Sequence, residues 1–422
     1  MSRNRLVKLI RIGGVVAVVA LALLLGLRVQ ARAEERSLEN EFREKVGPLD
    51  PAAYASPVVP DGENAAIWLR AAAAALVLEK ADKDLVAEMT SLPADAWTAD
   101  QRAAIGRLFS RIAPALDLAE RASTKRLSSY LLSGTQATSV KPDIPVLELL
   151  WLARLIREHA LFALESGDSA AYRLDVSRLA CIAASLERET PLIAQLIGLA
   201  AERMMADVIL AGVRAPAIER AALDHLDAVI PDVDLATAWR RALGGLGAGV
   251  HSGGVDLRNM FDAASTKVVM SVPSPEEYLR IVLGVAGLAS RPMGLDGALA
   301  DRLEKSKQLE KGRPTADTLA GSLVRYQSIL SLRRLARLAI AVRLEALDTG
   351  RYPDTLAAWP EASAPDPFTG GSLRYERRAD GSAAISVPGA EDLYNRINEL
   401  KTFVPYTWEL PAPRPAASTV KR

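Results

Sequence analysis

Histidines, which often bind metals and transfer protons, are few in this chain and far apart. The sequence has three of them, His159, His225 and His251. Two histidines that share a zinc ion on one helix stand four residues apart, as in His-Glu-x-x-His. No such spacing occurs here, and we predict no metal ligands. His159 follows Glu158 at the expected end of a helix and His225 lies between two aspartates, so we interpret both as surface or helix-end residues.

A glycine-rich stretch at 244–249 invites comparison with a phosphate-binding loop. Such a loop needs a strand before it, a helix after it and a Gly-Lys-Ser or Gly-Lys-Thr at its end. Here a helical segment precedes the glycines and no Gly-Lys follows, so we interpret the stretch as a flexible connection. Ser252 stands between His251 and Gly253, but the Gly-x-Ser-x-Gly spacing of a hydrolase is missing.

The residues therefore predict no catalytic, cofactor-binding or metal-binding side chain, and we expect a protein that is not an enzyme. The single cysteine, Cys181, lies in an apolar helical pattern and is interpreted as a small buried side chain. One alternative stays open. Acidic side chains that meet only in the folded chain would make the protein an envelope hydrolase whose site is invisible in the sequence.

The composition predicts a mainly α fold. Half of the 422 residues are apolar and only 5% are aromatic, so the core must consist chiefly of Ala, Leu, Val and Ile. The formal net charge is +1 and no basic stripe follows the N-terminal cluster. Nucleic acid is therefore not an expected partner.

The N-terminal region predicts a membrane anchor. Arg3, Arg5, Lys8 and Arg11 precede an uncharged apolar run at 12–27. As a helix this run would be about 24 Å long, against a hydrocarbon core of about 30 Å. The positive cluster places the N-terminus in the cytoplasm and the bulk of the chain in the periplasm, so we expect a single-pass protein of the inner (cytoplasmic) membrane. The alternative is a cleaved secretion signal, because the sequence up to Ala33 ends in the small-x-small form of a cleavage site.

Helical periodicity dominates the middle of the chain. It predicts a hairpin and a third helix within 146–213, with a turn at 165–168, and further helices at 65–79, 98–118, 216–229, 232–243, 275–289 and 316–348. The last of these is amphipathic and carries a row of arginines at 325, 333, 334, 337 and 343. Such a row could bind acidic partners or lipid head groups, but we interpret it as a solvated face.

These observations divide the chain into seven segments. We predict an anchor or signal at 1–30, a charged and then proline-rich spacer at 31–62, a helical domain at 63–245, a glycine-rich connection at 246–274, helices at 275–349, a tail module at 350–410 and a disordered tail at 411–422. Within the tail module, strands at 373–377 and 383–387 flank Asp380-Gly381, a hairpin signal. We expect a small core of Tyr352, Phe368, Leu373 and Tyr375 against the long helix, at Leu338, Val342 and Leu347.

The tail module resembles a known family. The segments 350–356 (GRYPDTL), 366–370 (DPFTG) and 373–375 (LRY) are similar to the end of type II secretion pseudopilins. They are equally similar to the tails of uncharacterised membrane-anchored bacterial proteins that carry this module behind a helical domain. The similarity covers about 350–388 only. The pseudopilin processing site is absent, since Gly13-Gly14-Val15 stands at the N-terminus, and no acidic calcium loop follows Val387. The resemblance thus implies a shared small fold and not a filament subunit.

Together these expectations describe a membrane-tethered extracytoplasmic helical protein. Its role would be scaffolding or binding in the cell envelope, with an envelope protein as a possible partner. A further alternative, which depends on the tail module, is an accessory component of a type II secretion-like system.

Overall fold

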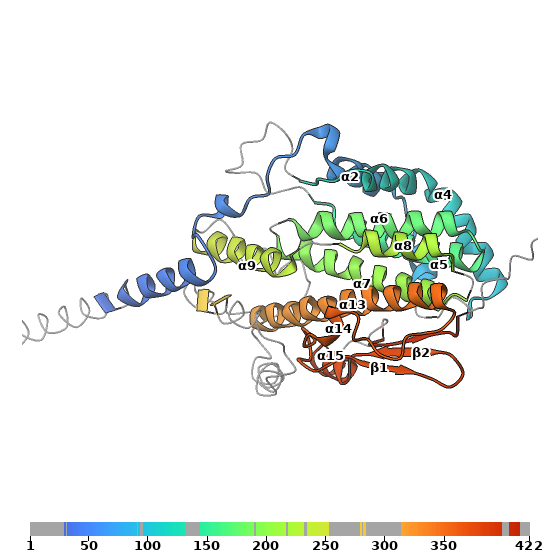
Figure 1. Ribbon diagram of the computed structural model, residues 1–422. Coiled ribbons are helices and arrows are strands. Elements are labelled where there is room, and N and C mark those ends of the chain that lie inside the picture. Colours follow the sequence, from blue (N-terminus) through green and yellow to red (C-terminus); the bar gives the residue numbers. More distant parts are fainter. Residues whose placement is uncertain are drawn as a thin grey trace, which may run out of the picture.

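The computed structural model confirms a mainly helical chain with a small antiparallel sheet (Figure 1). It describes residues 29–30, 32–90, 92, 96–130, 144–189, 191–216, 218–231, 234–252, 279–280, 282–283, 314–398 and 405–413. The predicted anchor at 12–27 lies outside these residues, as do most of the predicted helix at 275–289 and the end of the tail. Within the described part of the chain, no helix combines the length and the apolar character that crossing a membrane requires.

The helical body is built around three consecutive helices. These are α5 (Val146–Glu165), α6 (Ser169–Glu187) and α7 (Leu192–Arg214), which pack against one another as the periodicity predicted. The turn between the first two depends on Gly167, which has a positive φ of 75°, and on Asp168, which caps α6 by accepting a hydrogen bond from the backbone of Ala171.

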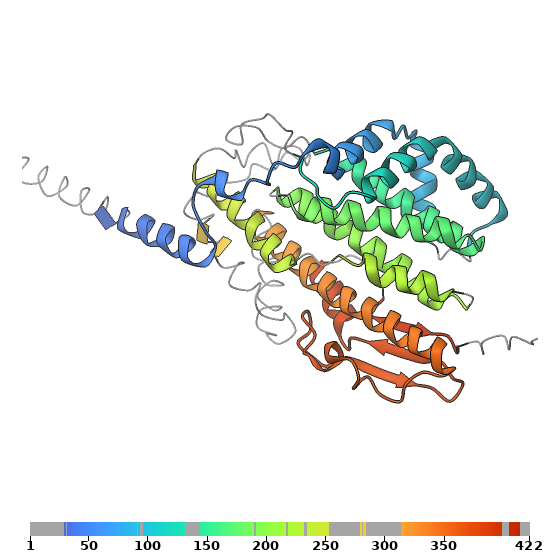
Figure 2. The same ribbon diagram turned by 45° about the horizontal axis from the view of Figure 1, so that its top comes forward.

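Further helices cover this trio on both sides. On one side α4 (Ala99–Ser123) packs against α6, and α2 (Ala65–Ala75) and α3 (Lys80–Thr90) pack against α4. Thr98 and Gln101 form a capping box at the start of α4, and Pro114 lies inside it. On the other side lie α8 (Arg220–Val229) and the long helix α13 (Pro314–Thr349). Figure 2 shows α13, in orange, between the helical body and the sheet, in red.

The tail module has one more strand than the sequence predicted. Strands β1 (Arg374–Arg377) and β2 (Ala383–Ser386) form the expected hairpin, and β3 (Thr407–Leu410) adds to the far edge of β2. Two short helices, α14 (Pro360–Ser363) and α15 (Ala390–Asn398), complete the module. Tyr352 and Phe368 are fully buried, as expected, whereas Tyr375 is only half-buried. The buried aromatic residues of the module also include Tyr406, which stacks with Phe368, and Trp408 of β3.

The glycine-rich stretch is not a flexible connection as far as the structure describes it. Helix α9 (Leu235–His251) runs through all of 244–249, which corrects the expected boundary at 246. A Cβ atom added at Gly244 would lie 2.2 Å from the Tyr54 ring, and one added at Gly247 would lie 2.6 Å from the Phe42 ring. The glycines are therefore places where aromatic rings meet the helix backbone.

The same contacts correct the interpretation of 31–62 as a spacer. Helical residues 32–45 are followed by a short 3-10 helix, η1 (Pro51–Tyr54). η1 packs against α9, and the preceding helix reaches α9 through Phe42 and Glu39. Phe42 is fully buried and Tyr54 is nearly so. The Arg241 guanidinium donates a hydrogen bond of 3.0 Å to the Tyr54 carbonyl. Prolines broke the helical pattern here, but the segment packs on the body through its aromatic side chains.

We expect Gly244→Ala to destabilise the protein. Alanine normally stabilises a helix relative to glycine by up to about 1 kcal/mol, but here the methyl group would collide with Tyr54, and overpacking costs about 1–3 kcal/mol. Gly106→Ala in α4 is the matched control, because an added Cβ meets nothing within 4 Å there, and it should stabilise. Urea unfolding of the full chain, followed by circular dichroism, measures both. Stabilisation by both substitutions would contradict the close contact.

Candidate functional site

A cleft of about 630 Å³ lies between α5, α7 and α13, next to the end of α3 and to α15. Volumes of about 300–1,000 Å³ are usual for small-molecule sites. Most of its lining is apolar, and it includes Leu150, Ile193, Leu196, Ile197, Leu199, Ala200, Met204 and Ile329. The charged lining consists of Arg154, Arg157, Arg203, Arg325 and Asp207. The cleft therefore combines an apolar surface with an excess of positive charge.

Helical spacing places these side chains together. Leu150, Arg154 and Arg157 stand four and three residues apart, so they share one face of α5. On α7 the same rule aligns Leu196, Ala200 and Met204 along one stripe. Three helices thus each present a mixed apolar and cationic face to one space. The spacing within each helix was visible in the sequence, but which faces meet was not.

Among the cleft arginines, Arg157 is neutralised by neighbours. Its Nε donates a hydrogen bond of 2.6 Å to Asp207 Oδ2, and its guanidinium also pairs with Glu158. Glu158 is fully buried and accepts a further hydrogen bond of 2.8 Å from the Thr90 hydroxyl. This group ties α3, α5 and α7 together at one wall of the cleft.

Arg154 and Arg325 differ from Arg157, because neither forms an ion pair with any residue that the structure describes. The Arg154 guanidinium lies 4.8 Å from the centre of the Trp151 ring, and burial lowers its pKa. Arg203, across the cleft on α7, stacks over the Tyr394 ring at 4.3 Å. Aromatic faces hold these cations in place without cancelling their charge. An anion in the cleft would find a partly desolvated guanidinium already positioned.

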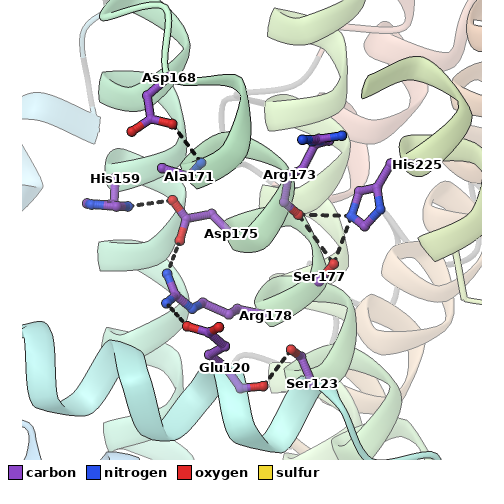
Figure 3. A network of polar contacts seen from close by, with 10 residues as sticks. All are labelled: Glu120, Ser123, His159, Asp168, Ala171, Arg173, Asp175, Ser177, Arg178 and His225. Atoms are coloured by element: carbon purple, nitrogen blue, oxygen red, sulfur yellow. Dashed lines mark hydrogen bonds and ion pairs between the residues drawn. The ribbon is translucent and has the colours of Figure 1, made fainter. Parts of the chain in front are cut away.

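A second polar group, on the far side of α5 and α6, corrects the interpretation of His159 as a surface or helix-end residue (Figure 3). His159 lies within α5 and its Nδ1 is 2.5 Å from the carboxylate of Asp175, which is fully buried. The other Asp175 oxygen accepts from Arg178 at 2.7 Å, and Arg178 also pairs with Glu120 of α4 at 3.2 Å. The group joins α4, α5 and α6, so its contacts are explained by the packing of these three helices.

Figure 3 also shows the one serine–histidine pair that bears on the hydrolase alternative among the described residues. Ser177 Oγ is 2.8 Å from His225 Nε2, and the Arg173 carbonyl is 3.0 Å from the same nitrogen. His225 is half-buried rather than a surface residue. In a catalytic triad an acid holds the other ring nitrogen, and no contact of that kind is found for His225 in the described chain. The pair therefore lacks the third member of a triad among the described residues.

The arginine row of α13 is not a solvated face. Arg333 reaches two buried glutamates, donating to Glu202 through Nε at 2.8 Å and to Glu187 through Nη2 at 3.1 Å. Arg343 is fully buried and donates to the Tyr352 hydroxyl at 2.8 Å. Arg334 donates to the Pro365 carbonyl at 2.9 Å. Of the row, Arg325 faces the cleft.

Glu187 and Glu202 share one guanidinium, so ionising both carboxyl groups would leave an excess negative charge in the core. Burial, together with the neighbouring charge of Glu202, raises the pKa of Glu187 well above its usual 4.5. Glu187 therefore stays protonated where ordinary glutamates are ionised. Gly198 allows this arrangement, because a Cβ there would lie 3.1 Å from Glu187 Cγ and 3.2 Å from the Ala183 carbonyl.

His251, the third histidine, ends α9 with Nε2 3.5 Å from Glu39. No group of three or more histidine, cysteine or acidic side chains suited to a metal ion occurs among the described residues. The cleft is therefore the candidate site. Sequence reasoning missed it because apolar stripes with scattered arginines also describe ordinary helices in a core.

We expect Glu187→Gln to change the pH dependence of stability. Because the folded pKa of Glu187 is raised, the folded chain holds more protons than the unfolded chain between the two pKa values. Wild-type stability is then greatest below the unfolded pKa and falls as the pH rises toward the folded pKa. Glutamine cannot ionise, so the variant should gain stability relative to the wild type by up to about 1.4 kcal/mol per pH unit above about pH 5.

Urea unfolding across a pH series measures this difference. Arg333→Met is the companion variant, since it breaks the ion pair with Glu202 and should cost about 3–5 kcal/mol. A pH-independent difference between Glu187→Gln and the wild type would show that Glu187 is ionised in the folded protein.

Comparison with known proteins supplies no template for the site. No protein-family model, no curated protein and no solved structure matches the chain. The contacts of the described side chains are therefore the evidence on which a function can be built.

Proposed function

We propose that the protein is a membrane-tethered binding protein of the cell envelope. Residues 12–27 hold it in the inner membrane, the bulk of the chain lies in the periplasm, and the α5–α7–α13 cleft binds a ligand without transforming it. The location is supported by the positive cluster at 3–11 before an uncharged apolar run. The binding role is supported by the cleft.

The observation that carries the binding role is Arg154. A guanidinium that is half-buried among apolar side chains, with an aromatic face and no carboxylate from the described residues beside it, has lost hydration without gaining an ion pair. A bound anion would offset that cost. Other buried arginines have their partners within the fold. Arg157, Arg178 and Arg333 pair with acids, and Arg343 donates to the Tyr352 hydroxyl and the Pro411 carbonyl. Arg154 differs in that it faces the cleft with the Trp151 ring beside it.

A second candidate is an accessory role in a type II secretion-like system. The observation that favours it is the tail module, whose sequence at about 350–388 resembles the end of pseudopilins. In this module an antiparallel sheet packs against the long helix α13 that precedes it. In that case the cleft would bind a segment of an envelope protein partner. The hydrolase alternative is supported less well, because Ser177 and His225 meet without an acid among the described residues.

The proposed topology predicts the behaviour of fusions. Alkaline phosphatase, which is active only in the periplasm, should be active when fused after Arg422, and β-galactosidase fused at the same place should be inactive. The opposite pattern would place the body in the cytoplasm. N-terminal sequencing of the purified protein distinguishes a retained anchor from a cleaved secretion signal. A mature protein that begins at Glu34 would show that the signal is cleaved and would contradict the anchor.

The binding role predicts that blocking the cleft abolishes the uptake of an anionic probe. Ala200 lines the cleft on α7, so Ala200→Trp should fill it. Anilinonaphthalene sulfonate, titrated into the full-length protein in phosphatidylcholine nanodiscs, should bind the variant at least about tenfold more weakly, a loss of about 1.4 kcal/mol. Ala103→Trp is the matched control, because Ala103 is exposed on α4. Equal binding to all three proteins would show that the cleft is not a ligand site.

A further inference from the structure

We propose that the ligand of the cleft is a single-chain acyl amphiphile with an anionic head group, bound with its head at Arg154 and its chain along α7. This inference rests on the proposed binding function and names the chemical class that the cleft would take. Its evidence is the shape of the apolar surface, the placement of charge and the character of the entrance.

The apolar surface is elongated. Leu196, Ala200 and Met204 follow one another at intervals of four residues on α7, which makes a strip about 12 Å long at 1.5 Å per residue. Leu150 of α5 and Ile329 of α13 face the same space. A narrow apolar strip with walls from neighbouring helices suits a linear hydrocarbon chain better than a compact ring system.

The strip continues onto the surface. Ile193 stands one turn before Leu196 and is 53% exposed, and Leu147 stands one turn before Leu150 and is 64% exposed. Both are large apolar side chains that extend the apolar strip outward, and a contiguous exposed apolar surface next to a cleft is typical of a binding groove. The entrance is therefore apolar, as a chain that leaves a lipid phase would require.

The charge within the cleft selects an anion. Guanidinium groups bind carboxylates and phosphates through two parallel hydrogen bonds. Arg154 and Arg325 come from different helices and have no acidic partner among the described residues. Burial lowers the pKa of Arg154, which agrees with a cation that lacks a compensating charge. A carboxylate or phosphate head group supplies that charge.

An extended peptide fits the same surface less well. Its amide groups would each need a hydrogen-bond partner, and leaving them unpaired in an apolar site is costly. Apart from the charged groups, the lining offers the hydroxyls of Thr90, Ser328 and Tyr394. An acyl chain makes no such demand.

Photo-crosslinking tests the proposal on the full-length protein in phosphatidylcholine nanodiscs. The probe is palmitic acid with a diazirine in its chain, and the matched neutral probe is the corresponding alcohol. Mass spectrometry should map the acid to the cleft-lining residues of α7 and α13, with at least about tenfold less labelling by the alcohol, equivalent to about 1.4 kcal/mol. Unlabelled palmitate and a lysophospholipid with an anionic head should compete, and the stronger competitor identifies the head group. Inorganic phosphate alone should not compete.

Variants locate the head group. Arg154→Gln should reduce labelling at least about tenfold and Arg154→Lys should retain part of it, because a lysine keeps the charge. Arg107→Gln, at an exposed position on α4, should label like the wild type. Since Arg154 contacts only the Trp151 ring among the interactions found for it, the variant should keep its fold, and an unchanged unfolding midpoint checks this.

Each negative result of these experiments contradicts a different part of the proposal. Equal labelling of the cleft by acid and alcohol would overturn the anionic head group, and competition by inorganic phosphate would overturn the acyl chain. Labelling confined to residues outside the cleft, while Ala200→Trp still weakens the sulfonate probe, would reject the acyl class and leave the binding function intact. If neither probe depends on Ala200, both proposals fail together.

Discussion

The contact of Arg333 with Glu187 and Glu202 joins the two halves of the molecule. Arg333 belongs to α13, whose far side carries the sheet, while the two glutamates belong to α6 and α7 at the centre of the helical body. Buried ion pairs contribute little net stability, because desolvation cancels most of the attraction, but breaking one is costly. What the contact fixes is position. A long helix with apolar faces could slide or rotate on its neighbours, and one guanidinium between two carboxyl groups selects a single register.

That register also sets the cleft. Arg325 and Ile329 precede Arg333 on α13, and on α7 Glu202 lies within the stretch from Ile193 to Asp207 that lines the cleft. The two helices are therefore held together next to the space that they line. Gly198 contributes from the other side, because it lets α6 approach α7 closely enough for Glu187 to share the arginine. The geometry of the candidate site is a consequence of packing that lies next to it, and its walls come from regular helices rather than loops.

Periodicity predicted the helices and the hairpin because both depend on local patterns. It failed where a residue's role depends on something distant. The glycines at 244 and 247 suggested a loop, since glycine disfavours helices. In the structure they lie in a helix, and aromatic rings from the N-terminal segment occupy the space that a side chain at either position would need. Strand β3 was not predicted, because it is only four residues long and is defined by its pairing with β2 rather than by a local pattern. The arginine row looked like a solvated face because the acidic partners of Arg333 lie more than a hundred residues away. His159 was misinterpreted for the same reason, since its partner Asp175 belongs to the next helix.

The buried arginines of this chain differ in what they contact, and the difference bears on the candidate site. A helical body made of Ala, Leu and Val offers little to specify which faces meet, and paired arginines supply that specificity at Arg157, Arg178 and Arg333. Each of these has acidic partners from other helices, so removing the charge would be felt as a loss of fold. Arg154 has only the Trp151 ring among the contacts found for it, and it faces an apolar cleft. Arg343 is also buried without an acidic partner among the described residues, but it donates to the Tyr352 hydroxyl and the Pro411 carbonyl. Arg154 instead faces a space large enough for a ligand, and that placement is the main physical reason to regard the cleft as a binding site.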